Sequence, residues 1–324
     1  MLTIPEKRSV AAGLLAAAMI VAGGPALAQG KLRIGKSVPN SWAFSATDVG
    51  FQSGIFKQEG IDLSISSFKG DAQMQTGLTA GAVDVALGSG PGLGFRAKGV
   101  PAIGVAAMYG APSNLAVVVL EKSGIKTVAD LKGKRIGVTT GGSLTDWLSR
   151  ELSRQQGWGS DGMQVMPLGS MQARLAAMER GDLDAMVVES ASGFELEELK
   201  KGRILIDFGE IEKNFYTHVI YATDNMVQKR TDVLRRFLRG WFKTIAFIHA
   251  NKDATVKITA KAIDVRESVV SRIYDAQVNG FSRDGAWDPV AIEVIRKSLK
   301  ELGILETLPD ARTIYNDQFV PVKF

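Results

Sequence analysis

Short apolar runs alternate with helix-like patterns along the first part of the chain. Residues 32–38 and 83–87 are strand-like runs, and residues 61–68 carry polar side chains at every second position near their start. Residues 47–59 and 72–80, which separate these runs, have the spacing of helices. Because strands that alternate with helices pair in parallel, the pattern predicts an α/β fold with a mostly parallel sheet covered on both faces.

The same order of elements begins again after residue 133. Residues 134–137, Lys-Arg-Ile-Gly, repeat residues 32–35, Leu-Arg-Ile-Gly. Residues 181–185, Gly-Asp-Leu-Asp-Ala, repeat residues 81–85, Gly-Ala-Val-Asp-Val. Since several successive elements recur in order and at similar spacing, we predict two similar lobes.

Two crossings of the chain are expected to join the lobes. Strand-like segments at 114–120 and 217–223 flank the second repeat and are the predicted crossing points, which together form a hinge. Helical patterns then continue to the end of the chain and are expected to return to the first lobe; they lie at 232–249, 252–263, 266–279 and 289–302. The expected units are a signal peptide at 1–28, lobe 1 at 29–115 and 221–324, and lobe 2 at 116–220.

The first 28 residues have the features of a secretory signal peptide. Lys7 and Arg8 precede an apolar stretch at 10–22, and an A-x-A sequence ends at Ala28. As a helix the apolar stretch spans about 20 Å, which is shorter than the roughly 30 Å hydrocarbon core of a bilayer. We therefore expect cleavage after Ala28 and export of a free protein to the periplasm.

The composition argues against several kinds of site. The chain of 324 residues has no cysteine, which removes disulfides, a thiolate nucleophile and a lipid-carrying cysteine. Its two histidines, His218 and His249, have no partner at metal-ligand spacing, so neither a metal nor another cofactor is expected. The net charge is +5 and the basic residues are scattered, which disfavours nucleic acid and mildly favours anionic solutes.

A ligand in such a fold lies beyond the carboxyl ends of the strands, where loops lead into helix N-termini. Four loops fit this description, at 37–45, 88–91, 139–145 and 189–192, and all are rich in Gly, Ser, Thr or Asn. Neutral hydroxyl and amide donors suit an oxyanion that must later be released. The candidate ligand-binding residues are Asn40, Trp42, Phe44, Ser89, Gly90, Gly142, Ser143, Thr145, Glu189 and His218.

Several of these candidates have a second interpretation. Ser143 is also an ordinary helix cap, with Asp146 in the first turn, although cap and anion site use the same N–H groups. Trp42 and Phe44 either wall off an apolar part of the solute or pack beneath their loop. Glu189 either sits favourably in a first helical turn or binds an amine.

Other conspicuous residues are expected to be structural. Asp84 and Asp184 open equivalent strands, where a carboxylate satisfies nearby backbone donors, so acid–base catalysis is not predicted. Arg174 falls in mid-helix and is expected on a solvated face. The glycine-rich stretch 88–94 lacks the lysine of a phosphate-binding loop and is expected to be a turn.

The chain resembles, over nearly its whole length after residue 28, the ABC-importer binding proteins for aliphatic sulfonates, taurine and nitrate, together with the related thiamine-pyrimidine proteins. The segments that carry the resemblance are Lys31-Leu32-Arg33-Ile34-Gly35, Gly81-Ala82-Val83-Asp84-Val85-Ala86, Leu131-Lys132-Gly133-Lys134-Arg135-Ile136-Gly137-Val138, Gly181-Asp182-Leu183-Asp184-Ala185, and Arg235-Arg236-Phe237-Leu238 running to Asn251-Lys252-Asp253. Each segment is unspecific alone, and their order is specific.

The resemblance implies a type II periplasmic-binding-protein fold that closes around one solute, a small anion, and docks to a permease with a cytoplasmic ATPase. A monomer is expected. This chain has Val188-Glu189-Ser190 where many relatives have an aromatic residue, an acid and a proline, so that wall of the site is expected to differ. Two alternatives remain: an enzyme of the same fold acting on a pyrimidine or a sulfinate, and a sensory ligand-binding module. The enzymes of the group are associated with essential cysteines, which this chain lacks.

Overall fold

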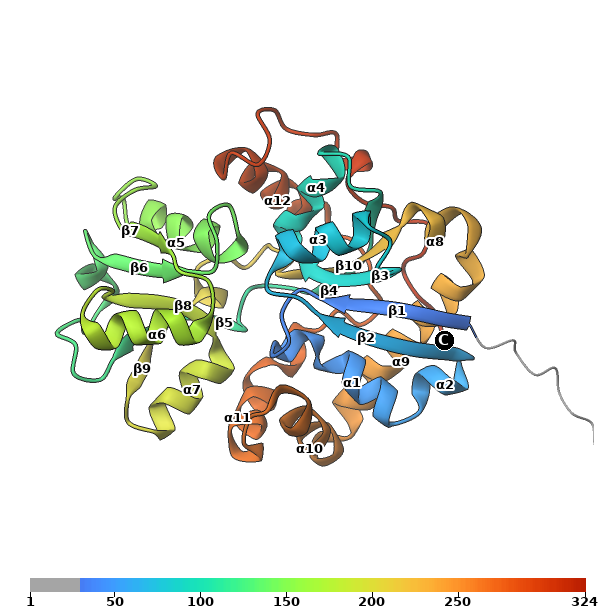
Figure 1. Ribbon diagram of the computed structural model, residues 1–324, viewed down its shortest axis with the longest axis horizontal. Coiled ribbons are helices and arrows are strands. Elements are labelled where there is room, and N and C mark those ends of the chain that lie inside the picture. Colours follow the sequence, from blue (N-terminus) through green and yellow to red (C-terminus); the bar gives the residue numbers. More distant parts are fainter. Residues whose placement is uncertain (1–29) are drawn as a thin grey trace, which may run out of the picture.

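The computed structural model describes residues 30–324, which form two α/β lobes, each built on a five-stranded sheet (Figure 1). The first sheet has the order β2 (Ile61–Ser67), β1 (Gly30–Lys36), β3 (Val85–Ser89), β10 (His218–Thr223) and β4 (Ala102–Tyr109). The second has the order β7 (Gln164–Pro167), β6 (Arg135–Val138), β8 (Ala185–Glu189), β5 (Leu115–Leu120) and β9 (Gly202–Asp207).

One strand in each sheet runs against its neighbours. β10 is antiparallel to β3 and β4, and β5 is antiparallel to β8 and β9, whereas the remaining described pairs are parallel. The prediction of two similar lobes with mostly parallel sheets is therefore confirmed. The expected signal peptide at 1–28 lies outside the described residues.

Helices cover both faces of the two sheets (Figure 1). In chain order they are α1 (Ser45–Gln52), α2 (Ile55–Gln58), α3 (Asp71–Thr79), α4 (Gly94–Ala97), α5 (Leu144–Gln155), α6 (Met171–Arg180), α7 (Ser190–Glu198), α8 (Asp224–Lys229), α9 (Thr231–Ala250), α10 (Lys252–Ile263), α11 (Glu267–Gln277) and α12 (Pro289–Glu301). No helix within residues 30–324 combines the length and the hydropathy needed to cross a bilayer.

The single helix predicted at 47–59 is wrong, because two short helices occupy this segment. Gly54 separates α1 from α2 and adopts a φ of 76°, in the left-handed region that residues with a side chain rarely enter. A continuous helix cannot pass through this conformation. The strand predicted at 83–87 is also displaced, since β3 begins at Val85.

The repeat seen in the sequence is reproduced at atomic detail. Asp84 accepts a hydrogen bond from the Arg33 backbone N–H at 3.0 Å and pairs with its guanidinium at 2.7 Å. Asp184 does the same with Arg135, at 2.8 Å and 2.9 Å. Each carboxylate, placed just before one strand, therefore binds a backbone N–H of the neighbouring strand, which confirms the structural role predicted for both.

The C-terminal helices pack back onto the first lobe, as predicted. α9 contacts α1, α2 and β2 through a face that includes Phe237, Trp241 and Phe242, all with 0% of their surface exposed. Burial of one such aromatic side chain contributes roughly 1.5–3 kcal/mol to stability. Two helices of this group also contact the second lobe: α11 packs against α7, and α12 is hydrogen-bonded to α5.

The chain passes between the sheets through residues 110–114, after β4, and through residues 208–217, after β9. The predicted crossings at 114–120 and 217–223 are therefore wrong in position. Their apolar runs form β5 and β10, which are buried within one sheet each, and the sheet changes in the irregular segments that precede them. Residues 218–220, which the sequence analysis assigned to lobe 2, consequently lie in the first sheet. The division of the chain into separate folding units remains a prediction.

Candidate functional site

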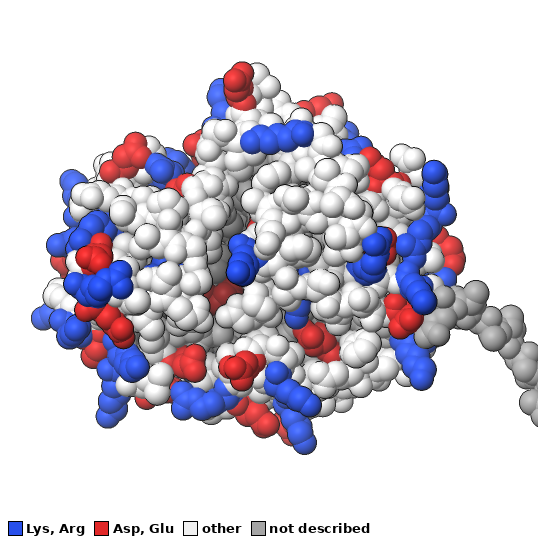
Figure 2. Space-filling model, in the orientation of Figure 1, with Lys and Arg blue, Asp and Glu red and all other residues white. Residues whose placement is uncertain are grey.

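A cavity of about 140 Å³ lies between the lobes, at the carboxyl ends of parallel strands from both sheets. Its lining residues are Ser37, Val38, Gly70, Asp71, Ala72, Ser89, Pro91, Gly92, Phe95, Leu115, Thr139, Thr140, Gly141, Gly142, Ser143, Leu144, Thr145, Glu189, His218 and Ile304. Figure 2 shows a hollow between the lobes with mostly uncharged walls. The position is the one expected for a ligand in an open α/β sheet.

The second lobe contributes a hydroxyl-rich loop that leads from β6 into the N-terminus of α5. Ser143 caps α5, and its Oγ accepts a hydrogen bond from the Asp146 N–H at 3.3 Å. The hydroxyls of Thr139, Ser143 and Thr145 lie within 2.9–3.0 Å of one another. Gly142 makes the turn possible, since its φ of 73° is in the left-handed region. The loop thus holds three hydroxyls beside the positive end of a helix dipole.

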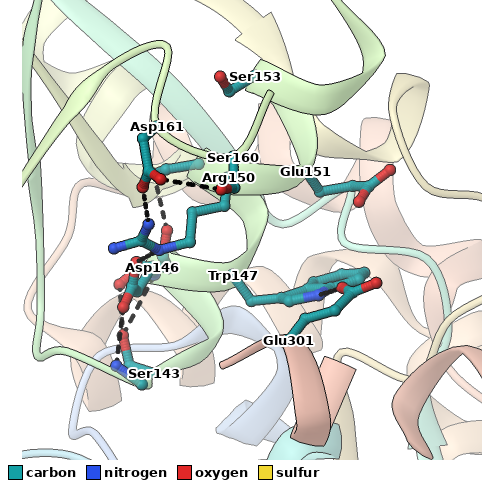
Figure 3. A network of polar contacts seen from close by, with 12 residues as sticks. Ser143, Asp146, Trp147, Arg150, Glu151, Ser153, Ser160, Asp161 and Glu301 are labelled. Atoms are coloured by element: carbon teal, nitrogen blue, oxygen red, sulfur yellow. Dashed lines mark hydrogen bonds and ion pairs between the residues drawn. The ribbon is translucent and has the colours of Figure 1, made fainter. Parts of the chain in front are cut away.

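Asp146, the acid in the first turn of α5, is bound by a backbone N–H and by an arginine of the same helix (Figure 3). Asp146 accepts the Gly142 N–H at 2.8 Å and pairs with Arg150 Nε at 2.7 Å. Arg150 in turn pairs with Asp161 at 2.5 Å. The same helix reaches the C-terminal end of α12, where Glu301 accepts hydrogen bonds from Trp147 Nε1 and from the Arg154 guanidinium, each at 2.9 Å.

Glu189 of β8 and His218 of β10 line the cavity, and Asn114 of the chain crossing contacts both. Asn114 donates from Nδ2 to Glu189 Oε2 at 3.1 Å and lies 3.2 Å from His218 Nε2. Because Nδ2 is a donor, the His218 Nε2 is an acceptor and its ring is neutral. Burial lowers the pKa of His218 to about 3, which agrees with a neutral ring at physiological pH.

Glu189 is a carboxyl group with an abnormal environment. Burial raises its pKa to about 7, against the opposing effects of the Asn114 amide, the Ser41 hydroxyl and the positive charge of Arg174. The expectation that Arg174 lies on a solvated face is wrong: only 4% of the residue is exposed, and its guanidinium donates to the Val187 carbonyl. Its side chain fits because it crosses Gly137, where a Cβ would lie 3.2 Å from the arginine methylenes.

Sequence reasoning missed Asp71, the first residue of α3. Its carboxylate accepts hydrogen bonds from the Ser89 N–H at 3.2 Å and from the Ser89 hydroxyl, and burial raises its pKa. A signal was present, because Gly70 and Asp71 stand between a strand and a helix, as the four chosen loops do. Asp71 is an acid of the first lobe in the cavity wall, and Glu189 is one of the second lobe.

A comparison with protein families now places the chain. The profile described as NMT1/THI5 like matches residues 45–255, which is more than half of the sequence. The chain belongs to the NMT1/THI5-like family. The resemblance to this group of proteins, which the sequence segments carried, is therefore confirmed.

Members and fold relatives of the NMT1/THI5-like family include binding proteins. A Brucella abortus protein, provisionally named a binding protein, is 28% identical over 266 residues, which cover 75% of this chain and 80% of its own. An Escherichia coli K12 protein, provisionally named for aliphatic sulfonates, is 26% identical over 66% of both chains.

Solved structures share the two-lobed fold. The alkanesulfonate-binding protein SsuA of Xanthomonas axonopodis, bound to MOPS, has a TM-score of 0.73 at 19% identity and covers 87% of this chain and 95% of its own. The periplasmic SsuA of Escherichia coli has a TM-score of 0.75 at 19% identity, covering 89% and 92%. The desulfurization enzyme DszB also has this fold, with a TM-score of 0.65 at 18% identity over 89% and 97% of the chains. The fold therefore serves both binding proteins and an enzyme.

The cavity between the lobes contains most, but not all, of the residues proposed from the sequence. Those that line it are Ser89, Gly142, Ser143, Thr145, Glu189 and His218. Gly90 is outside the lining set because its N–H donates to the Thr217 carbonyl, and the Tyr216 carbonyl occupies the space where a side chain would begin. Asn40 lies in the turn that precedes the 3-10 segment at 42–44 and is also outside the lining set.

Trp42 and Phe44 lie in the core instead of on the cavity wall. The Trp42 ring centroid is 5.5 Å from that of Phe281 and 6.1 Å from that of Tyr274, both in the C-terminal part of the chain. The Phe44 ring is 4.7 Å from the His218 ring, so it supports a cavity residue from behind. The second interpretation, packing beneath the loop, is the one observed.

Among the described residues, no cluster of three or more histidines, cysteines or acids has the geometry of a metal site.

Proposed function

We propose that this NMT1/THI5-like protein is the periplasmic solute-binding component of an ABC importer. It captures a small organic or inorganic anion, of the sulfonate, taurine or nitrate kind, in the cavity between its lobes. It then delivers the anion to a membrane permease that a cytoplasmic ATPase drives. The observation that carries the proposal is the cavity at the carboxyl ends of strands from both sheets, lined from both lobes.

The preference for an anion rests on the loop that enters α5. The first N–H groups of a helix have no acceptor within the helix, and the helix dipole adds a partial positive charge there. One helix end contributes roughly 0.3–2 kcal/mol toward a negative ligand, against about 8 kcal/mol for micromolar binding. The hydroxyls of Ser89, Ser143 and Thr145 add neutral donors.

The relatives support capture of a solute over catalysis. Those reported above carry names of binding proteins, and two of the solved structures bind sulfonates by name. DszB shows that the fold also serves an enzyme, but this chain has no cysteine to act as a nucleophile. A sensory partner in place of the permease would leave the cavity unchanged.

Two helix caps of the same type allow a test of the anion end. Ser143 and Ser170 both cap a helix by accepting a hydrogen bond from the third residue after them, but only Ser143 lines the cavity. We expect Ser143→Ala to weaken every accepted solute about 2- to 30-fold, the range that corresponds to one cap or helix-end contact. Ser170→Ala is expected to lower stability similarly and leave affinity unchanged.

The measurement is titration calorimetry, after a thermal-shift screen of sulfonates, carboxylates, nitrate and pyrimidines has found binders, since binding raises the melting temperature by mass action. Unchanged affinity of Ser143→Ala for every binder would contradict the anion site at α5. Tighter binding of simple cations than of anions would overturn the anionic class itself.

A further inference from the structure

The charges that line the cavity have one sign. Its two ionisable acids are Asp71 and Glu189, and no lysine or arginine is among the lining residues. Among the described side chains, neither carboxyl group is in a direct ion pair; Asp71 is bound by Ser89, and Glu189 by Asn114, with the charge of Arg174 nearby. Because a buried carboxyl group that lacks a direct ion pair is costly to ionise, both favour a positively charged partner.

A continuous row of polar groups connects the two acids across the chain crossing. Asp71 binds Ser89, and Ser89 is the cross-strand neighbour of His218 in the pair β3–β10. Asn114 then links His218 to Glu189. The row therefore runs from the first lobe to the second along one side of the cavity.

One buried acceptor in this row has no partner among the described residues. Asn114 is 1% exposed, and its Oδ1 accepts no hydrogen bond from these residues. His218 is not counted with it, because its Nε2 is the acceptor and its Nδ1 is therefore a donor. Since buried polar atoms are almost always hydrogen-bonded in folded proteins, an unpaired one beside a cavity points to a ligand that completes it.

We propose that this row binds the nitrogen end of the solute, so that the solute is a zwitterion with a protonated amine or amidine at one end and an anion at the other. Glu189 and Asp71 accept hydrogen bonds from the nitrogen, and the loop at 139–145 binds the anion. The anionic half of this proposal rests on the proposed function. The nitrogen half stands on the two acids and the unpaired Asn114 Oδ1 alone.

The sheet geometry limits the length of such a solute. Glu189 ends β8, and the loop at 139–145 follows β6, the strand beside it in the second sheet. Neighbouring strands lie about 4.8 Å apart. The two ends of the solute are therefore separated by only a few bonds, as in a β-amino sulfonate or a β-amino acid.

Matched pairs of probes test the nitrogen end. Taurine and ethanesulfonate differ only in the amine, and so do β-alanine and propionate. Titration calorimetry on the full-length protein at pH 8 is expected to show at least tenfold tighter binding of the amine member of a pair. Glu189→Gln and Asp71→Asn are each expected to reduce that ratio at least threefold and to leave the affinity for the amine-free member within threefold.

A third variant controls for the change in net charge. Asp161→Asn removes one negative charge from an exposed carboxylate outside the cavity, 81% of whose side chain is accessible, and is expected to preserve the ratio. Melting curves of all variants show whether each is folded. Equal affinity for both members of each pair in the unaltered protein would overturn the nitrogen end and leave the anion-binding function intact. Binding of ethylamine as tight as that of taurine would support the nitrogen end and contradict the anionic one, and no binding of any probe would contradict both.

Discussion

At the scale of single residues, the cavity is distinguished by acids whose environment disfavours their charge. Burial raises the pKa of Glu189 to about 7, and Arg174, Tyr109 and His218 are the ionisable groups that face it or its amide partner. Arg174 favours the charged form, whereas His218 is neutral and Tyr109 remains protonated, because burial raises its pKa above its ordinary value. A buried ionisable residue whose charged form lowers the stability of the protein is typical of a functional site.

This cost predicts how stability depends on pH. The unfolded state loses the Glu189 proton near its ordinary pKa of 4.5, whereas the folded state retains it until about pH 7. The free energy of unfolding therefore falls between these values and stays lower above them. We expect Glu189→Gln to be more stable than the unaltered protein by about 1–3 kcal/mol at pH 8, and the difference to vanish near pH 4.5.

Thermal or urea unfolding at several pH values measures this difference. Asp71 and Asp207, whose pKa values are also raised by burial, titrate in both proteins, so the comparison isolates Glu189. A variant that is less stable at pH 8 than at pH 4.5, relative to the unaltered protein, would refute the burial argument.

Which side chains reach the cavity was only partly predictable at this scale. Hydroxyls beside a helix start, such as Ser143 and Thr145, are tied to local sequence and were predicted. Trp42 and Phe44 were not placed correctly, since their direction depends on contacts with Phe281 and His218, which are distant in the sequence. Arg174 was misplaced for the same reason, because the groove over Gly137 exists only in the folded lobe.

At the scale of elements, the repeated strand–helix–strand unit explains why the fold was largely predictable. The Arg33–Asp84 and Arg135–Asp184 pairs recur at equivalent positions, because each carboxylate satisfies a backbone N–H of the neighbouring strand. Local chemistry of this kind is visible in the sequence. The break at Gly54 was also visible as a glycine, but its left-handed conformation is decided by how α1 and α2 pack against α9.

The repeated ion pair is expected to contribute to stability and not to solute binding. Hydrogen bonding to Arg135 holds the pKa of Asp184 below its usual value, opposed by burial, so its contribution is present above about pH 4 and is lost as pH falls further. We expect Asp184→Asn to lower the free energy of unfolding at pH 7 by about 1–2 kcal/mol and to leave solute affinity within a few-fold.

Calorimetric binding and unfolding curves on the same preparation provide the check. Asp84→Asn, in the equivalent pair of the first lobe, is expected to behave alike. Complete loss of binding by Asp184→Asn at an unchanged melting temperature would mean that this carboxylate acts on the solute after all.

At the scale of the whole molecule, contacts on both sides of the cavity connect the lobes. Glu301 of α12 holds Trp147 and Arg154 of α5, and α11 pairs with α7 through Arg266–Glu198 and Arg272–Glu197. These pairs join helices of different lobes. Exposed ion pairs of this type contribute only about 0–1 kcal/mol each to stability. The crossing segments 110–114 and 208–217 were not identified from the sequence, since an apolar strand and a crossing strand look alike until the sheet order is known.

The last prediction concerns closure of the lobes about these crossings. Because the solute is proposed to touch both lobes, we expect binding to favour an arrangement in which the lobes are closed and the α5–α12 contacts are made. Removal of those contacts should shift the free protein toward an open arrangement.

We expect Glu301→Ala without ligand to have a larger radius of gyration than the unaltered protein by small-angle scattering, and to contract to the same value when the tightest-binding probe saturates it. Glu293→Ala is the matched control, since Glu293 also lies in α12 but pairs with Arg296 of its own helix, and it should not change the radius. One radius shared by all proteins, with and without ligand, would show that the lobes do not move.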